Sequence, residues 1–462
     1  MAVNNTSVRS VEFESSVSRE GGPFNLNDGE LTPIVKGAAV QKGTSWGASV
    51  FLVVNAALGA GLLEFPYAYN QAGGVLVAVV VQAVLMLFIC GALVLLAYCS
   101  DIHQSATYQD VVYAMCGKWA QAACSLCIVL YCFGTCITFF IIIGDNWDKL
   151  LYKVRPDFCY SWYMNRKFTI SITSVLFILP LCFPRRIDFL KYASAFGVLA
   201  IVYIVILIPV KYFYATNLES VVVKTRPDTW MDVFLVVPTI CFGYQCHISV
   251  VPIYSCLQNR TVKEFAKTLT AAIFICLITY TVGATFGYLN FGTAVKSDIL
   301  SSYNATADVL VAVSMMAAKT YTTYPILLFC GRAAFESLWV ELWKLTPEDI
   351  VRKETLRRII QTILWFGLSL LLAVVTPNIA VVIDLLGGLA AVFIFTFPGL
   401  CLLQVVLTRQ RTEKNKHSQR ALFIMAVMYL IIGMFIFGVT FSQSIMDDVH
   451  SKSSKSHKTI CG

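Results

Sequence analysis

Two apolar segments of the sequence are interrupted by residues that break helices and can bind charged groups. The first segment covers residues 46–71 and contains Asn55-Ala-Ala-Leu-Gly-Ala-Gly61, followed by Glu64-Phe-Pro66. Glycine and proline both destabilise a helix interior, because glycine is flexible and proline lacks an N–H group. We therefore expect the helix to unwind near Gly59 and Gly61.

The second interrupted segment covers residues 230–256. It contains Pro238-Thr-Ile-Cys-Phe-Gly243, then Tyr244-Gln-Cys-His247, and a further proline at position 252. A glycine and three polar side chains here interrupt an otherwise apolar run. The two breaks lie in the first and sixth apolar segments, which are equivalent positions if the chain is built from two halves of five helices.

The chemistry expected at such breaks is recognition of opposite charges by bare peptide groups. The N-terminus of a half-helix offers free N–H groups to a carboxylate, and freed C=O groups suit an ammonium or a sodium ion. A zwitterionic amino acid requires both. We predict that the substrate contacts the backbone at Gly59, Ala60, Gly61, Cys241, Phe242 and Gly243. The alternative is that the glycines only allow close helix packing, but the matched second break favours a binding site.

Composition places these segments in a membrane. Of 462 residues, 57% are hydrophobic and only 13% are charged, whereas soluble domains have about a quarter of their residues charged. A water-facing surface cannot be covered with so few polar groups, whereas a bilayer-facing surface is itself apolar. A soluble globular protein is therefore excluded.

Apolar runs long enough to cross a ~30 Å hydrocarbon core recur along the chain. We predict an all-α polytopic membrane protein with eleven transmembrane helices within a domain at 44–444, a disordered cytoplasmic tail at 1–43 and a short luminal tail at 445–462. The predicted spans are 46–71, 73–99, 119–144, 167–183, 191–214, 230–256, 265–289, 307–333, 357–375, 378–405 and 421–444.

The distribution of basic residues gives the orientation. If the N-terminus is cytoplasmic, 22 of the 35 Lys and Arg residues lie on the cytoplasmic side and 12 on the other side, with Lys319 inside a span. This agrees with the positive-inside rule and places the C-terminus in the lumen. The sequon Asn304-Ala-Thr306 then lies on the luminal side, where Asn304 is a candidate glycosylation site.

Other functional classes find little support in the sequence. It contains no Ser-His-Asp order, HExxH motif, P-loop or paired carboxylates typical of enzymes. The basic residues flank apolar segments and form no aromatic-interleaved patch for nucleic acid. Most of the 16 cysteines are scattered singly through apolar runs, where cysteine packs as a small hydrophobe. We expect no enzyme activity, no nucleic-acid partner and no cofactor other than a coupling ion.

The two broken segments resemble those of the amino acid/auxin permease family. Asn55 to Gly61 with Phe65-Pro66 is similar to the family's first helix, and Phe242-Gly-Tyr-Gln-Cys-His247 is similar to its sixth. The resemblance is closest to the sodium-coupled neutral amino acid transporters, and among them to the lysosomal exporters of glutamine and asparagine. Supporting stretches include Ile141-Ile-Ile-Gly-Asp145, Tyr324-Pro-Ile326 and Phe397-Pro-Gly-Leu-Cys-Leu402.

This resemblance implies an inverted-repeat fold of five plus five helices with an eleventh helix appended. It also implies sodium-coupled symport of L-glutamine and L-asparagine across the lysosomal membrane towards the cytosol. The family's sodium site falls here on Asn55, the carbonyl of Leu58, and Thr322 or Thr323. Amide, carbonyl and hydroxyl oxygens suit such a hard cation. Either threonine could instead hydrogen-bond to its own helix.

Several ionisable residues depart from an apolar pattern. Lys319 and Asp384 lie inside spans, where a charge is costly and often functional. They could pair with each other, or Lys319 could extend towards the luminal face. Glu64, just past the first break, could act as a gate, contact the substrate ammonium, or lie solvated at the rim. His247 could titrate between cytosolic and lysosomal pH, or it could be a hydrogen-bonded packing residue.

Two alternatives to sodium symport remain open at the level of sequence. Proton-coupled or exchange transport would use the same breaks. A transporter-like nutrient sensor would bind the amino acid without moving it, and the tail could bind cytosolic nutrient-signalling proteins. A measurement of flux separates transport from sensing.

Overall fold

The computed structural model describes residues 44–154, 162–184, 191–216, 218–346, 348, 353–376, 379–409 and 416–453. Within them the chain is helical apart from turns, connections and one isolated backbone bridge between Thr44 and Leu257. The predicted N-terminal tail and residues 454–462 lie outside the described residues. The last helix continues to Ser453, past the predicted end of the transmembrane domain at 444.

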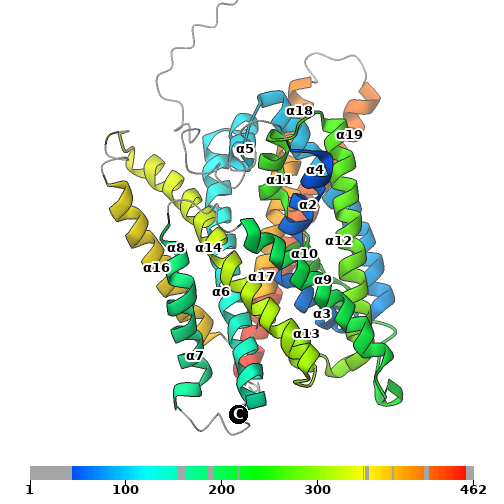
Figure 1. The fold of residues 1–462 in the computed structure, drawn as a ribbon. Coiled ribbons are helices and arrows are strands. Elements are labelled where there is room, and N and C mark those ends of the chain that lie inside the picture. The colour runs from blue at the N-terminus through cyan, green and yellow to red at the C-terminus, as the bar shows by residue number, and fades with distance from the viewer. Residues whose placement is uncertain are drawn as a thin grey trace, which may run out of the picture.

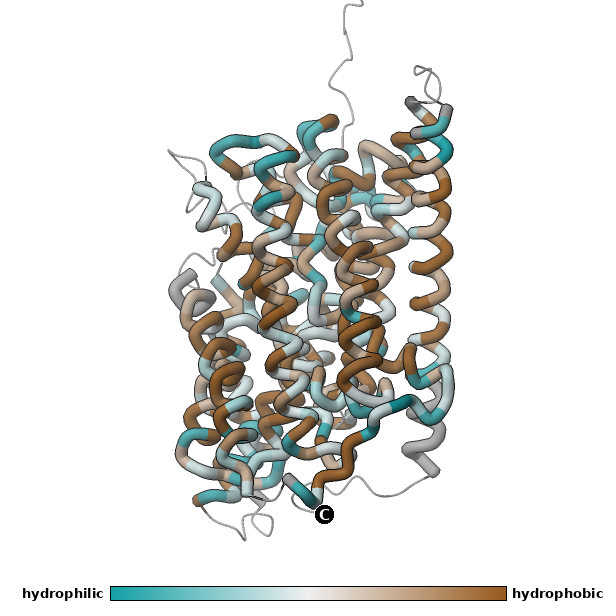
Figure 2. Tube along the Cα trace, turned by 90° about the vertical axis from the view of Figure 1, so that its right-hand side faces the viewer, coloured by the Kyte–Doolittle hydropathy of each residue, from teal (hydrophilic) through white to brown (hydrophobic). Residues whose placement is uncertain are grey.

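Eight segments of the described chain are long and apolar enough to cross a membrane. The three other predicted spans are also helical, and each has a reason to miss this criterion. The first is divided by its break, the fourth is short, and the eighth carries a polar stretch from Lys319 to Tyr324. The prediction of a polytopic all-α membrane protein is confirmed, and Figure 2 shows the apolar residues concentrated along the helices between more hydrophilic ends.

The first five spans and their connections are formed by a series of helices, several of them interrupted. They are α2 (Trp46–Ala57), a 3₁₀ turn (Ala60–Leu63) and α3 (Phe65–Gln71) in the first span; α4 (Val75–His103); the short connecting helix α5 (Tyr108–Cys116); α6 (Lys118–Val154); α7 (Arg166–Thr173), a π-helical turn (Ser174–Ile178) and α8 (Leu179–Cys182) in the fourth span; and α9 (Lys191–Phe213).

The remaining six spans follow after a 3₁₀ turn at Trp230–Phe234. They are α10 (Val237–Gly243) and α11 (His247–Ser255) in the sixth span; α12 (Val262–Phe291); the short helix α13 (Ile299–Ser302) before α14 (Ala307–Trp343); α16 (Glu354–Val375); α17 (Ile379–Ala391), a π-helical turn (Val392–Thr396) and α18 (Phe397–Arg409) in the tenth span; and α19 (Lys416–Ser453).

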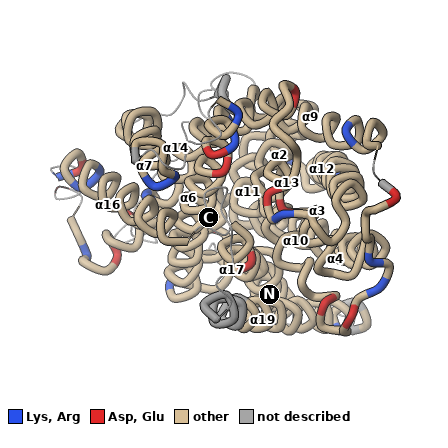
Figure 3. Tube along the Cα trace, turned by 90° about the horizontal axis from the view of Figure 1, so that it is seen from below, with Lys and Arg blue, Asp and Glu red and all other residues tan. Residues whose placement is uncertain are grey.

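The two broken spans lie inside the bundle. The half-helix α10 packs against α17, and α12 packs against α2, α3, α4 and α9. The helix α14 packs against α6 and α9, and α19 packs against α17 and α18. Figure 1 shows α2, α10 and α17 surrounded by the other helices. Seen from below, Lys, Arg, Asp and Glu are few and scattered among the other residues (Figure 3).

Candidate functional site

The first span unwinds between Ala57 and Phe65, as predicted. The helix α2 ends at Ala57, and Leu58 (φ −73°, ψ 93°) and Gly59 (φ −120°, ψ −159°) are extended. A 3₁₀ turn follows, and α3 begins at Phe65 with Pro66 in its first turn. Proline is favourable at a helix start and unfavourable inside a helix, so the sequence itself separates the two halves.

The second break lies in the sixth span, also as predicted. The helix α10 ends at Gly243, and α11 begins at His247. The residues between them leave the helical conformation, with ψ close to 11° at Tyr244 and 2° at Cys246. The two spans that the sequence marked as interrupted are therefore both divided into half-helices.

The two breaks touch each other. A Cβ atom added at Gly61 would lie 3.1 Å from the Cα of Gly243 and 3.4 Å from Cδ1 of Phe242. A Cβ atom added at Gly243 would lie 2.6 Å from Cε2 of Phe65. Only glycine fits this contact without a shift of its neighbours. The structure thus brings Gly61, Phe242 and Gly243 together, three of the six predicted substrate-binding residues.

The other three predicted substrate-binding residues have different surroundings. Ala60 and Cys241 are buried in the core of the bundle. Gly59 is half-buried, and an added Cβ atom would meet nothing nearer than its neighbour's carbonyl, the oxygen of Ala57 at 3.9 Å. This is an ordinary van der Waals distance, so the protein itself leaves room for a methyl group at Gly59. These six residues remain a predicted substrate site.

A tyrosine on α12 connects the two breaks. The hydroxyl of Tyr280 lies 2.8 Å from the carbonyl oxygen of Ala57 and 2.9 Å from that of Gly243, and it accepts a longer bond, 3.4 Å, from the N–H of Gly59. A hydroxyl has one proton, so it donates to one carbonyl at a time. Phe65 stacks on the Tyr280 ring with 4.4 Å between ring centroids.

Sequence reasoning missed Tyr280, because α12 has no break and no motif distinguishes Tyr280 from Tyr288 in the same helix. A second polar network behind the break was also missed. Gln82 on α4 accepts a 2.7 Å bond from the hydroxyl of Tyr69 and donates a 2.7 Å bond to that of Tyr244. It joins α3 to the linker between α10 and α11. All of these side chains are buried, and buried polar groups without such partners would be costly.

The carbonyl of Leu58, one of the predicted sodium ligands, is bonded to a lysine. Nζ of Lys319 on α14 donates to Leu58 O at 2.8 Å. The two predicted threonine ligands bond to their own helix, with Thr322 Oγ1 donating to the carbonyl of Ala318 or of Lys319 and Thr323 Oγ1 to that of Lys319. Asn55 lies half-buried near the end of α2. The sodium site remains a prediction.

Two expectations about charged residues are wrong. Lys319 neither pairs with Asp384 nor extends to the luminal face, because within the described residues its ammonium meets only the Leu58 carbonyl and the residue is 7% exposed. Glu64 is not a solvated rim residue. It is 1% exposed, and its Oε2 atom has no hydrogen-bond partner within the described part of the chain. Asp384 lies close enough to Glu64 to interact electrostatically.

The two remaining predicted residues can be located, and their roles remain predictions. His247 opens α11 and is fully buried, with Nδ1 3.1 Å from Oε1 of Gln245 and no partner for Nε2 among the described residues. Asn304 is exposed in the connection between α13 and α14, where a glycan would have space.

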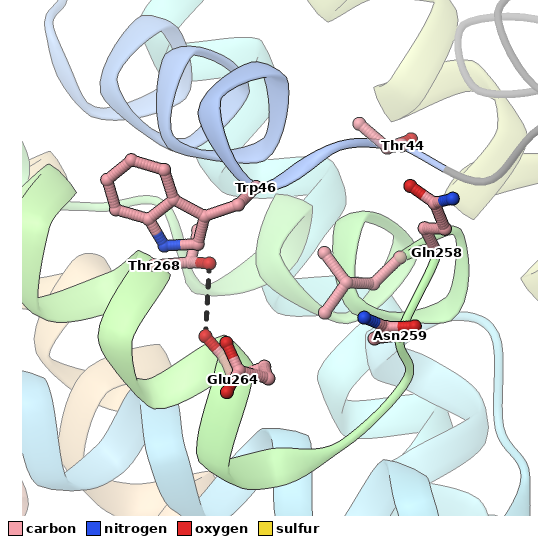
Figure 4. Close-up of a pocket in the computed structure, with 7 residues that line it drawn as sticks. Thr44, Trp46, Gln258, Asn259, Glu264 and Thr268 are labelled. Carbon is pink, nitrogen blue, oxygen red and sulfur yellow. Dashed lines mark hydrogen bonds between the residues drawn. The ribbon is translucent and has the colours of Figure 1, made fainter.

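The cavity drawn in Figure 4 lies away from the paired breaks, at the start of α2. It has a volume of about 60 Å³, whereas ligand pockets are typically about 300–1,000 Å³. Its lining residues are Thr44, Trp46, Leu257, Gln258, Asn259, Glu264 and Thr268. Next to it, the N–H of Thr44 donates to the carbonyl of Cys256 at 2.8 Å, and the N–H of Gln258 donates to the carbonyl of Thr44 at 3.1 Å. This backbone clasp ties the start of α2 to the end of α11.

Comparison with known proteins gives a consistent result over most of the chain. The family model described as transmembrane amino acid transporter protein matches residues 42–446. The chain is 46% identical over 414 residues to sodium-coupled neutral amino acid transporter 7 of Danio rerio, covering 88% of each chain. It is 45% identical over 412 residues to the Homo sapiens protein of that name, covering 88% of this chain and 89% of the relative. It is 35% identical over 410 residues to solute carrier family 38 member 8 of Homo sapiens, covering 86% and 93%.

Proposed function

This chain belongs to the transmembrane amino acid transporter family, and from that premise we propose that it moves neutral amino acids across a membrane. Its family consists of transporters and not of enzymes. The observation that carries the proposal is the contact between two mid-span breaks, at Gly61 and Gly243, in the first and sixth spans.

Recognition of the substrate follows from the helix ends at these breaks. The start of α11 presents N–H groups and the positive end of a helix dipole, which suit a carboxylate. The end of α10 carries the negative end of a helix dipole, which suits an ammonium, whereas the carbonyl of Leu58 at the end of α2 is bonded to Lys319. A neutral amino acid carries both groups at fixed separation, so its backbone is held whatever its side chain.

Movement of the substrate requires the half-helices to separate alternately on the two sides of the membrane. The clasp formed by Thr44 with Cys256 and Gln258 holds the first and sixth spans together at the end of the bundle where α2 begins. With the N-terminus in the cytosol, release of substrate to the cytosol requires this clasp to open. Two backbone hydrogen bonds contribute only about 1–3 kcal/mol, which is small enough for repeated opening.

The finer proposal is symport of L-glutamine and L-asparagine across the lysosomal membrane towards the cytosol. Two relatives are named as sodium-coupled, which makes sodium the first coupling ion to test. Proton-coupled or exchange transport is the second candidate. The ammonium of Lys319 on the Leu58 carbonyl favours coupling without sodium.

The test is counter-flow of labelled amino acids in proteoliposomes containing the full chain. We expect exchange of glutamine and asparagine, with sodium and pH varied independently. Gly59→Ala should raise the apparent KM about tenfold, because its methyl group would compete with the substrate proposed to bind there, at a cost of roughly 1–3 kcal/mol. The matched control is Gly438→Ala on α19, where an added Cβ atom meets nothing within 4 Å.

The outcome of this experiment also separates transport from sensing. A nutrient sensor would bind glutamine without exchanging label across the bilayer. Absence of exchange for every neutral amino acid, in protein that binds one of them, would overturn the proposed transport. Equal KM values for Gly59→Ala and Gly438→Ala would show that the substrate does not contact the first break at Gly59.

A further inference from the structure

The eighth span carries a buried lysine with an unusual partner. Lys319 lies in the first half of α14, and its ammonium donates a 2.8 Å hydrogen bond to the carbonyl oxygen of Leu58. No ion pair within the described residues includes Lys319. A buried ammonium without a carboxylate is expensive in a membrane, so its position must be stabilised in another way.

The stabilisation comes from the end of α2. Leu58 is the first residue after this half-helix, and its carbonyl is released because the chain turns extended there. Lys319 Nζ is its only hydrogen-bond donor among the described residues. The C-terminal end of a helix carries partial negative charge that favours a cation within the last turn. The ammonium therefore occupies the position that this break offers to a positive ion.

The surrounding helices are shaped to hold the lysine there. A Cβ atom added at Gly197 on α9 would lie 3.2 Å from Cγ, 3.4 Å from Cδ and 3.5 Å from Cε of Lys319. The aliphatic part of the Lys319 side chain thus packs against α9 at Gly197, which has no side chain to displace it. This contact fixes the stem in the bundle interior and is independent of the hydrogen bond to Leu58.

We propose that the ammonium of Lys319 is the resident cation of the first break, in the place where the family resemblance puts sodium, and that amino acid transport by this chain does not depend on sodium. This inference rests on the proposed function for its transport readout. A second unit charge about 4 Å from the ammonium would weaken sodium binding roughly a thousandfold at an effective dielectric constant of about 20. The two cations therefore exclude each other.

The first experiment measures sodium binding without any substrate. Thermal unfolding of the purified full chain is followed in NaCl and in equimolar N-methylglucamine chloride at one pH. The wild type should unfold at the same temperature in both salts. Lys319→Ala should be stabilised by sodium, because it frees the Leu58 carbonyl and leaves space for an ion. Lys319→Met should show no sodium response, because its side chain fills most of that space.

A matched control removes a different buried lysine. Lys149 on α6 also donates to backbone carbonyls, those of Leu300 and Tyr303, but away from the breaks. Lys149→Ala should therefore gain no sodium response, although it should lose stability in both salts. A sodium response in Lys149→Ala equal to that of Lys319→Ala would overturn the assignment to the first break.

The second experiment measures counter-flow in the same two salts. Wild-type exchange should agree within about twofold, whereas Lys319→Ala should exchange at least tenfold faster in sodium. A wild-type rate that falls tenfold or more without sodium overturns the proposal, as does sodium stabilisation of the wild type. If Lys319→Ala does not fold, the proposal is tested by the sodium dependence of the unfolding temperature and of the exchange rate of the wild type. If the wild type exchanges no amino acid, the proposed function fails while the unfolding experiment still tests this inference.

Discussion

The hydroxyl of Tyr280 lies within hydrogen-bond distance of a carbonyl at each break, and its removal tests whether the two breaks act as one unit. Tyr280→Phe keeps the ring that stacks on Phe65 and deletes only the oxygen. The carbonyls of Ala57 and Gly243 then share no donor, and the N–H of Gly59 loses its acceptor. Because a hydroxyl donates one proton at a time, the loss amounts to about one buried hydrogen bond.

The magnitude follows from the burial of these groups. A buried carbonyl left without a donor costs about 1–3 kcal/mol. This corresponds to a roughly 5- to 150-fold increase in the population that is open at the breaks. The long bond from Gly59 adds little, since hydrogen bonds weaken with distance. The stacking of the ring on Phe65 is unchanged in the variant, so the effect is assigned to the hydroxyl.

The assay is site-resolved thiol labelling of detergent-purified protein with a small maleimide, read by mass spectrometry. Cys241 is fully buried on α10 next to the break and reacts only when the break opens. We expect its labelling rate to rise 5- to 150-fold in Tyr280→Phe. Cys124, buried on α6, reports global opening and should change much less.

The matched control lies on the same helix. Tyr288 is also a buried tyrosine of α12, but its hydroxyl accepts from the N–H of Lys224 in a connecting segment at 2.7 Å. Tyr288→Phe should leave labelling of Cys241 at the wild-type rate. Equal labelling of Cys241 in wild type and Tyr280→Phe would refute the reasoning, because the two breaks would then be held together without this hydroxyl.

Three further predictions follow from other contacts. Gly243→Ala places a methyl group 2.6 Å from the Phe65 ring, so it should cost about 1–3 kcal/mol and lower counter-flow well below that of Gly438→Ala. Arg166→Met removes the cation bonded to Asp145 at 2.6 Å and Asp148 at 2.8 Å, and the yield of monodisperse protein in size-exclusion chromatography should fall with a loss of roughly 3–5 kcal/mol. Burial, followed by repulsion from Asp145, raises the pKa of Asp298, in the connection before α14, from 3.8 to about 6. Its protonated form is thus favoured by folding, so this contribution to stability is complete below pH 3.8 and is lost as the pH rises through 6. The unfolding temperature of Asp298→Asn should therefore fall less than that of the wild type as the pH rises from 3.8 to 6. An equal fall in the two proteins would contradict this prediction.

The sequence alone determined the spans and the places where two of them break. Apolar length identifies a membrane helix because the hydrocarbon core has a fixed thickness, and glycine with proline marks unwinding because their effect on the backbone is local. Helix ends were less well determined. The helix α6 continues to Val154, past the predicted end at 144. The apolar run ends there, but the next turn carries Asp145 and Asp148, whose ion pairs with Arg166 stabilise the helix further along the chain.

The tertiary structure alone decided which side chains meet at the breaks. Tyr280 and Leu58 lie on different helices from the groups that bond them, and no local pattern encodes a contact between α12 or α14 and the end of α2. The same holds for Lys319, which the sequence marked as a buried charge without indicating a carbonyl as its partner. Periodicity and hydropathy are properties of one helix, whereas the partner of a buried polar group depends on how the helices pack around it.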